Sequence, residues 1–162
     1  MKEKNSIRIK KDIYEIEVND NGDKIYFDLK DISIGNKYLE AIQKVNEEKK
    51  KYNKELQNIF QKYNLKMDKI KKINFDDGIG RYIYQLEMNF FYKAREIIDG
   101  VLGKNACQKI FGDSNYPEMF DELAKALEPH FKRMQFDIKS RQKELLKKYN
   151  NNKKEKYNKV IS

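Results

Sequence analysis

The chain has 162 residues, of which 39% are hydrophobic and 38% charged, and its net charge at pH 7 is +9. This length allows one domain with a modest core, or one domain with an extended helical arm. No apolar run approaches the ~20 residues that span a membrane, and the first residues lack the apolar segment of a secretory signal. The single cysteine, Cys107, cannot form an internal disulfide. We therefore expect a cytoplasmic protein with no membrane partner.

The positive charge is concentrated near the C-terminal end of the sequence. Residues 1–130 contain 24 Lys and Arg against 23 Asp and Glu, whereas residues 131–162 contain 11 against 3. An argument from charge for a nucleic-acid partner therefore applies only to the last fifth of the chain.

The N-terminal region, residues 1–35, has the pattern of a β-hairpin. Apolar and polar residues alternate over 14–18 and again over 25–29, with a turn-forming cluster at Asn19–Asp23 between them. Residues 6–10 can add a further short strand. A lone hairpin is marginal in water, so its apolar face must cover the helices or pair with another copy. Its edge is a candidate for strand addition, although a cap on a helical core is the favoured interpretation.

A helical pattern begins at Asn36 and extends over residues 36–73. Apolar residues recur there at spacings of three and four, which is a heptad-like seam typical of coiled coils. A continuous helix would be roughly 55 Å long at 1.5 Å per residue, so it either bends, most readily near Asn64, or packs on another chain. Packing against residues 79–102 is at least as good an interpretation of the seam as binding a partner. The candidate partner-binding residues are Tyr38, Ile42, Val45, Tyr52, Leu56, Ile59 and Tyr63.

The next segments predict a helical corner. Residues 79–102 form a central helix whose broad aromatic face indicates burial on more than one side. Gly103 and Gly112 can each take the left-handed conformation that ends a helix, which leaves room for one short helix between them. A new helix should begin near Pro117, and Pro129 should kink or end it.

Beyond residue 130 the sequence predicts a basic helical extension that breaks at Asn150–Asn152, followed by a disordered tail from Lys153. Such a segment can neutralise phosphates without reading their sequence, or it can contact an acidic protein surface. Nucleic acid is not the favoured partner. The candidate contact residues are Lys139, Arg141, Lys143, Lys147, Lys148, Lys153, Lys154 and Lys156.

No residue pattern indicates catalysis. His130 is the only histidine and lies beside a proline, which favours a capping or surface role, and Cys107 has the setting of a small buried residue. Phosphate-binding loops, zinc-ligand spacings and nucleophile motifs are missing from the sequence. We therefore expect a binding protein with no catalytic residues, no metal and no cofactor.

Together these patterns predict a mainly α fold with an N-terminal β-hairpin (α+β). It comprises the hairpin region 1–35, a helical core over 36–130 with long amphipathic helices and a short connecting helix, and a basic C-terminal helix and tail over 131–162.

Within residues 12–130, three short runs follow one another in this order: Phe27–Asp31, Glu96–Gly103 and Cys107–Asp113. In this respect the chain resembles tail assembly chaperone-like proteins of tailed phages and prophages of Gram-positive bacteria. The resemblance implies a mostly helical, non-enzymatic protein of the bacterial host cytoplasm. It also implies two partners, the tape measure protein, whose long helices it keeps from aggregating, and the tail tube protein. The long helix over 36–73 and the basic extension are not part of the resemblance.

Two other classes of function remain open. One is a phage-encoded inhibitor or trigger of a bacterial defence system, anti-CRISPR-like, acting through the basic tail or the hairpin edge. The other is a nucleic-acid-binding accessory protein that uses the basic tail. The seam over 36–73 could also serve self-association into a homo-oligomer.

Overall fold

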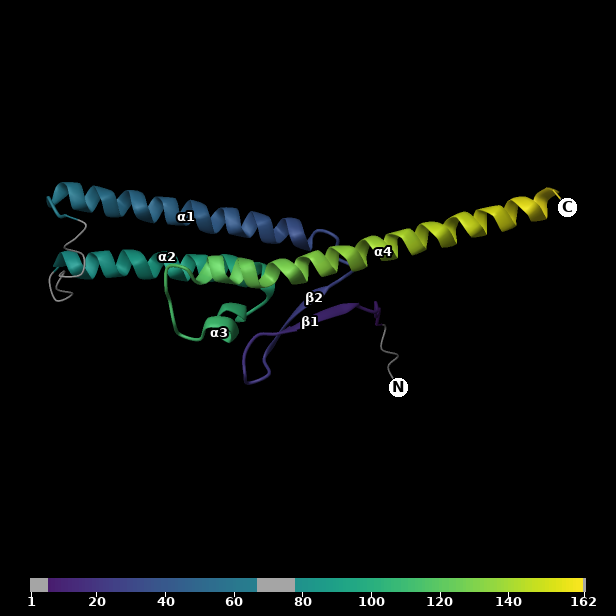
Figure 1. Cartoon of the computed structure of the whole chain (residues 1–162), viewed down its shortest axis with the longest axis horizontal. Helices are drawn as coiled ribbons and strands as arrows, with labels where there is room; N and C mark the ends of the chain where they lie inside the picture. The colour runs from purple at the N-terminus through teal and green to yellow at the C-terminus, as the bar shows by residue number, and fades with distance from the viewer. Residues whose placement is uncertain (1–5, 67–77, 162) are drawn as a thin grey trace. The chain divides into compact units, whose positions relative to one another are not determined.

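The computed structural model describes residues 6–66 and 78–161 (Figure 1). The predicted fold class is confirmed, because an N-terminal two-stranded hairpin is followed by long helices. The elements are β1 (Ile13–Glu17), β2 (Lys24–Asp28), α1 (Ile34–Lys62), α2 (Gly78–Leu102), α3 (Ala106–Phe111) and α4 (Met119–Ile161).

The chain forms two compact units, and neither is one continuous stretch of sequence. The strand–helix unit draws on residues 1–16, 26–35 and 116–162, and so contains the base of the hairpin and α4. The helical-hairpin unit draws on residues 17–25 and 36–115, and so contains the hairpin turn, nearly all of α1, and α2 and α3.

The β-hairpin follows from alternation and from its turn residues. Ile25, Phe27 and Leu29 are buried, while Tyr26 between them is exposed. In the turn, the side-chain oxygen of Asn19 accepts hydrogen bonds from the backbone N–H groups of residues 21 and 23, at 3.0 and 3.1 Å. The turn glycine, Gly22, has a φ of 80°.

The further strand expected over residues 6–10 is not formed, and that prediction is wrong. A strand needs a hydrogen-bonded neighbour, and the sheet of the described residues consists of β1 and β2. Ile7 is accordingly 93% exposed.

The helical-hairpin unit is built on α1 and α2, which run side by side in opposite directions (Figure 1). The predicted break near Asn64 is confirmed, because α1 ends at Lys62 and Asn64 takes a positive φ of 50°. The remainder of the predicted helix, residues 67–73, lies outside the described residues. The central helix predicted over 79–102 is confirmed as α2.

The corner after α2 is also as predicted. Gly103 and Gly112 have φ values of 110° and 60°, in the region that favours glycine, and α3 lies between them. Arg95 on α2 fixes the loop that follows α3, since its guanidinium donates hydrogen bonds to Asn115 Oδ1 at 2.8 Å and to the carbonyl of Ser114 at 2.6 Å.

The hairpin turn contacts α3 through two hydrogen bonds. Asn19 Nδ2 donates to the carbonyl of Lys109 at 2.9 Å, and Lys109 Nζ donates to the carbonyl of Lys24 at 3.2 Å. The turn therefore belongs to the packed structure of the helical-hairpin unit.

In the strand–helix unit the base of the β-hairpin packs on α4. The rings of Phe27 and Phe131 meet edge to face, with centroids 5.6 Å apart. The Tyr14 hydroxyl and His130 Nδ1 share a hydrogen bond of 3.0 Å. The sequence left open whether the hairpin covers helices or another copy, and its base covers a helix.

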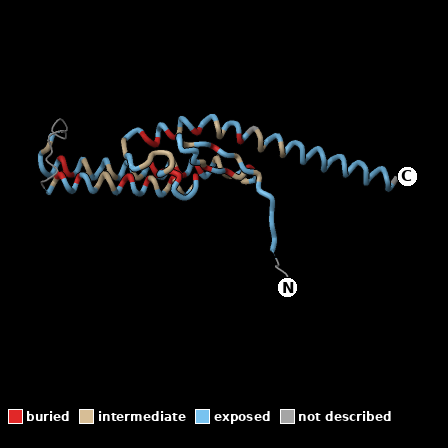
Figure 2. Tube along the Cα trace, turned by 90° about the horizontal axis from the view of Figure 1, so that it is seen from below, coloured by how far each residue is buried: buried red, intermediate tan, exposed pale blue. Residues whose placement is uncertain are grey.

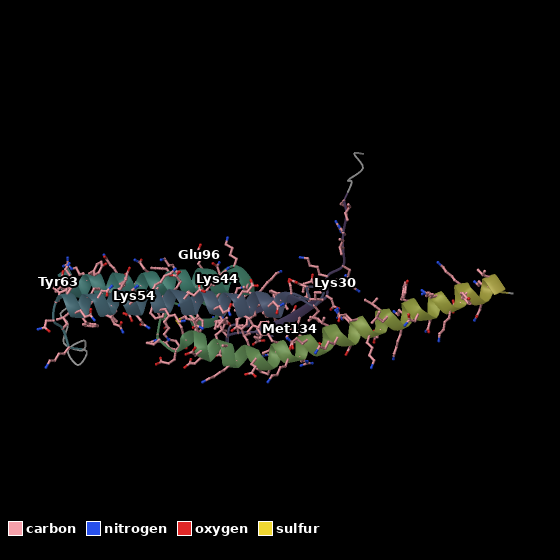
Figure 3. All side chains as sticks on the ribbon, turned by 90° about the horizontal axis from the view of Figure 1, so that it is seen from above. Lys30, Lys44, Lys54, Tyr63, Glu96 and Met134 are labelled. Carbon is pink, nitrogen blue, oxygen red and sulfur yellow. The ribbon has the colours of Figure 1, made fainter. Side chains whose placement is uncertain are left out.

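Helix α4 corrects two predictions. Pro129 was predicted to kink or end the helix, and the helix does not end there, although proline removes one backbone hydrogen bond and costs about 3 kcal/mol inside a helix. Pro129 is exposed, Leu127 before it is buried, and the contacts of His130 and Phe131 hold the helix after it. The next turn adds Met134, which is fully buried (Figure 3).

The predicted break at Asn150–Asn152 and the disordered tail from Lys153 are likewise wrong, because α4 continues to Ile161. An asparagine costs a helix only about 0.7 kcal/mol relative to alanine, and the flanking Lys, Glu and Leu residues are good helix formers. Figure 2 shows this part of α4 as exposed along its length.

Candidate interaction surfaces

The seam of α1 is mostly covered by the chain itself. Tyr38, Val45 and Ile59 are buried, and Ile42, Tyr52 and Leu56 are partly exposed. Tyr63, which follows the end of α1 (Figure 3), is 48% exposed. The structure thus brings six of the seven candidate residues to one partly or fully covered face of α1.

Contacts between α1 and α2 account for part of this burial. The Tyr52 ring stacks on Phe90 with centroids 5.8 Å apart and an angle of 23° between the planes. One turn away, Glu48 accepts a hydrogen bond from Lys51 at 2.9 Å and forms an ion pair with Lys93 of α2 at 3.6 Å. The hydrogen bond from Lys51 is the main cause that lowers the pKa of Glu48. Ring stacking and an ion pair thus join α1 to α2 within the chain. Any role of the seam in binding a partner stays a prediction.

The cysteine and the histidine are both held in structural contacts. Cys107 is buried, its backbone N–H donates to Asp99 Oδ1 at 2.7 Å, and burial followed by the nearby Asp99 charge raises the pKa of its thiol. Nucleophilic cysteines need a lowered pKa and access to solvent. His130 is half-buried and its Nδ1 is engaged by the Tyr14 hydroxyl. The Cys107 setting is therefore not that of a nucleophile, and the His130 contact joins β1 to α4.

The described residues contain no group of three or more His, Cys, Asp or Glu side chains that could hold a metal ion. An open cleft of about 810 Å³ lies between the last turns of α1 and the first turn of α2. Its wall mixes apolar, acidic, basic and amide side chains, namely Glu55, Asn58, Ile59, Lys62, Tyr63, Gly78, Ile79 and Tyr82.

The basic residues of α4 are almost all exposed. Of the eight candidates, Arg141 differs, because it is only partly exposed and forms an ion pair with Asp12 at the base of the hairpin. Arg141 therefore helps to hold the strand–helix unit together. The other seven are exposed and are distributed around helix α4: Lys139, Lys143, Lys147, Lys148, Lys153, Lys154 and Lys156.

Sequence reasoning missed an apolar surface on the same half of α4. From Gln142 to Val160 every residue is exposed. Five of them are large and apolar, with exposed fractions from 62% to 86%: Leu145, Leu146, Tyr149, Tyr157 and Val160. We call these five residues the α4 stripe. Their spacing was visible in the sequence, but a break at Asn150–Asn152 would have divided them, so no continuous surface was expected.

Comparisons with protein-family models, with curated proteins and with solved structures give no match to this chain. Among the helices of residues 6–66 and 78–161, none carries a segment long and apolar enough to cross a membrane.

Proposed function

We propose that the chain is a non-enzymatic chaperone that binds a long helical protein, which by the resemblance of residues 12–130 is the tape measure protein of a phage or prophage tail. The observation that carries the proposal is that the three long helices leave large apolar side chains exposed. Besides the α4 stripe, these include Leu39 on α1 and Tyr82, Tyr84 and Tyr92 on α2. Exposed apolar side chains on a helix, such as those of the α4 stripe, are what one amphipathic helix offers to another.

Two further observations support a binding role over catalysis. The buried titratable side chains that could act as nucleophiles are held with raised pKa values, as for Cys107, and the described residues offer no cluster of metal ligands. In this chaperone function the tail tube protein is a second partner, and the chain acts in the bacterial host cytoplasm.

The alternative is a protein that binds nucleic acid through α4. The observation favouring it is the group of seven exposed lysines on that helix. Phosphate contacts of this kind weaken steeply as salt is raised. An inhibitor or trigger of a host defence system would use the same exposed helix to bind a protein–nucleic acid complex of the host.

A pull-down separates these functions. The tagged chain is expressed together with its neighbouring genes, the lysate is treated with nuclease, and the proteins that stay bound in moderate salt are identified by mass spectrometry. A chaperone should retain a long, helix-rich tape-measure-like protein and should keep that protein in the soluble fraction on co-expression. Recovery of a host immune complex, or of nucleic acid that salt removes, would overturn the proposal.

A further inference from the structure

The α4 stripe occupies one face of a fully exposed helix. An α-helix repeats every 3.6 residues, so spacings of 3, 4, 8 and 11 bring residues back to about the same side. Leu145 and Leu146 precede Tyr149 by four and three residues, and Tyr157 and Val160 follow it by eight and eleven. The stripe therefore covers about one third of the circumference of α4 over roughly four turns.

The stripe continues a face of α4 that is buried nearer its start. Leu127 and Met134, which precede Leu145 by 18 and 11 residues, lie on the same side of the helix and are buried. On this side the hairpin base packs through Phe27, and the Asp12–Arg141 ion pair joins the two further along the helix. In the strand–helix unit the apolar face is thus covered up to Arg141 and exposed beyond it (Figure 2).

The charge around the stripe indicates the chemistry of what would cover it. Residues 142–160 carry seven lysines against two glutamates. By helical position, Lys148 and Lys159 border one side of the stripe and Lys143 and Lys154 border the other, while Lys153 and Lys156 lie between its apolar residues. Lysine stems can extend along apolar surface while their ammonium groups reach a neighbouring chain. A second copy of α4 would bring the same excess of positive charge into the contact, which disfavours self-pairing.

We propose that the stripe binds an acidic amphipathic helix of a partner protein, packed along residues 142–160 with its carboxylates beside the bordering lysines. This inference deepens the proposed function, because it names the surface and the charge of the helical partner. Phosphates alone would be bound by the lysines and would leave Leu145, Leu146 and Val160 without a role.

The test uses the full chain and synthetic peptides of about three heptads, a length that matches the stripe. The acidic probe has Leu and Ile at the a and d positions and Glu at e and g. One control replaces those Glu residues by Lys, and another scrambles the acidic sequence. Fluorescence anisotropy should show binding of the acidic probe, with the basic and scrambled peptides at least ~10-fold weaker.

The matched variants are L145A/L146A/Y149A on the stripe and K147Q/N151S on the opposite face. All five residues are exposed, and alanine favours helix, so circular dichroism should be unchanged. The stripe variant should bind the acidic probe at least ~10-fold more weakly, whereas the opposite-face variant should lose less than about 3-fold. Equal losses in both variants, equal binding of the acidic and basic probes, or displacement of the acidic probe by a DNA duplex that both variants bind equally would each overturn the proposal.

The same variants separate this inference from the proposed function. If the wild-type chain keeps a tape-measure-like protein soluble and the stripe variant does so equally well, the stripe inference fails and the chaperone function stands. If the wild-type chain binds the acidic probe through the stripe but retains no such protein from its gene neighbourhood, the chaperone function fails and the stripe inference stands.

Discussion

The Asp99 carboxylate on α2 accepts a hydrogen bond from the backbone N–H of Cys107 on α3, at 2.7 Å. The residue before α3, Asn105, makes no side-chain cap hydrogen bond. A neighbouring helix therefore supplies the acceptor that a local N-cap residue would otherwise provide.

Replacing Asp99 by Ala should lower the free energy of unfolding by about 1.5–3 kcal/mol, because a charge-assisted hydrogen bond to a buried N–H is lost. Urea denaturation followed by circular dichroism measures the change. Glu96→Ala, one turn earlier and exposed, is the matched control and should change stability by less than about 0.5 kcal/mol. Equal effects of the two substitutions would show that the Asp99 contact does not stabilise α3.

The Phe27–Phe131 contact should be essential to the strand–helix unit. Phe27→Ala should cost about 3–5 kcal/mol, because Phe27 is buried and its ring packs edge to face on α4. Tyr26→Ala, on the exposed side of the same strand, is the control. A double-mutant cycle with Phe131→Ala should give a coupling energy of about 0.5–1.5 kcal/mol, and a coupling near zero would contradict the contact.

Tyr38 should make the chain sensitive to alkaline pH. Burial raises the pKa of its hydroxyl from 10.0 to about 12, so the folded chain holds this proton more tightly than the unfolded chain. The resulting stabilisation is complete below pH 10 and is lost as the pH rises towards 12. Tyr38→Phe should therefore lose less stability than the wild type between pH 8 and 12, measured by urea denaturation at each pH. Tyr92→Phe, at an exposed position, should keep the wild-type pH dependence.

Cys107 should be protected from thiol reagents. Burial of the side chain limits the access of such reagents, and the raised pKa of the thiol lowers the fraction of thiolate that they attack. Reaction with a chromogenic disulfide in native buffer should be roughly 100-fold or more slower than in denaturant, since access requires local opening. A native rate close to the denatured rate would show that the corner between α2 and α3 opens freely.

The exposed half of α4 should add little to stability. Removing residues 143–162 takes away only exposed residues among those the structure describes there, so the free energy of unfolding should change by less than about 0.5 kcal/mol. Far-ultraviolet circular dichroism should nevertheless show a loss of helix. Truncation after Phe131 is the contrasting variant and should be strongly destabilising, because it removes the buried Met134 and the partner of Asp12.

Local signals in the sequence were sufficient for most of the fold. The hairpin turn, the end of α1 near Asn64 and the stops at Gly103 and Gly112 were predicted because each depends on the residues at that point. The penalties at Pro129 and Asn150–Asn152 were also local, but contacts of His130 and Phe131 and the helix-forming neighbours outweigh them. Sequence alone therefore divided one long helix into a first helix, a basic helical extension and a disordered tail.

The candidate surfaces were harder to predict because they depend on which faces the chain itself covers. The periodicity of Tyr38, Val45 and Ile59 indicated an apolar face but not what covers it. The pairing of Arg141 with Asp12 joins distant parts of the sequence, so nothing local distinguished this arginine from the neighbouring lysines. The α4 stripe went unrecognised because an expected helix break removed its continuity.

The hairpin base and its partner helix α4 lie far apart in the sequence, and this affects the order in which the chain can fold during synthesis. Tyr14 and His130 are separated by 116 residues, and a similar length of sequence separates Phe27 from Phe131. While the ribosome is still making the middle of the chain, α1 and α2 can already pair, but the hairpin base has no α4 to pack on. Its buried phenylalanine is then open to solvent until α4 has been made, so a chain interrupted before α4 should be prone to aggregate.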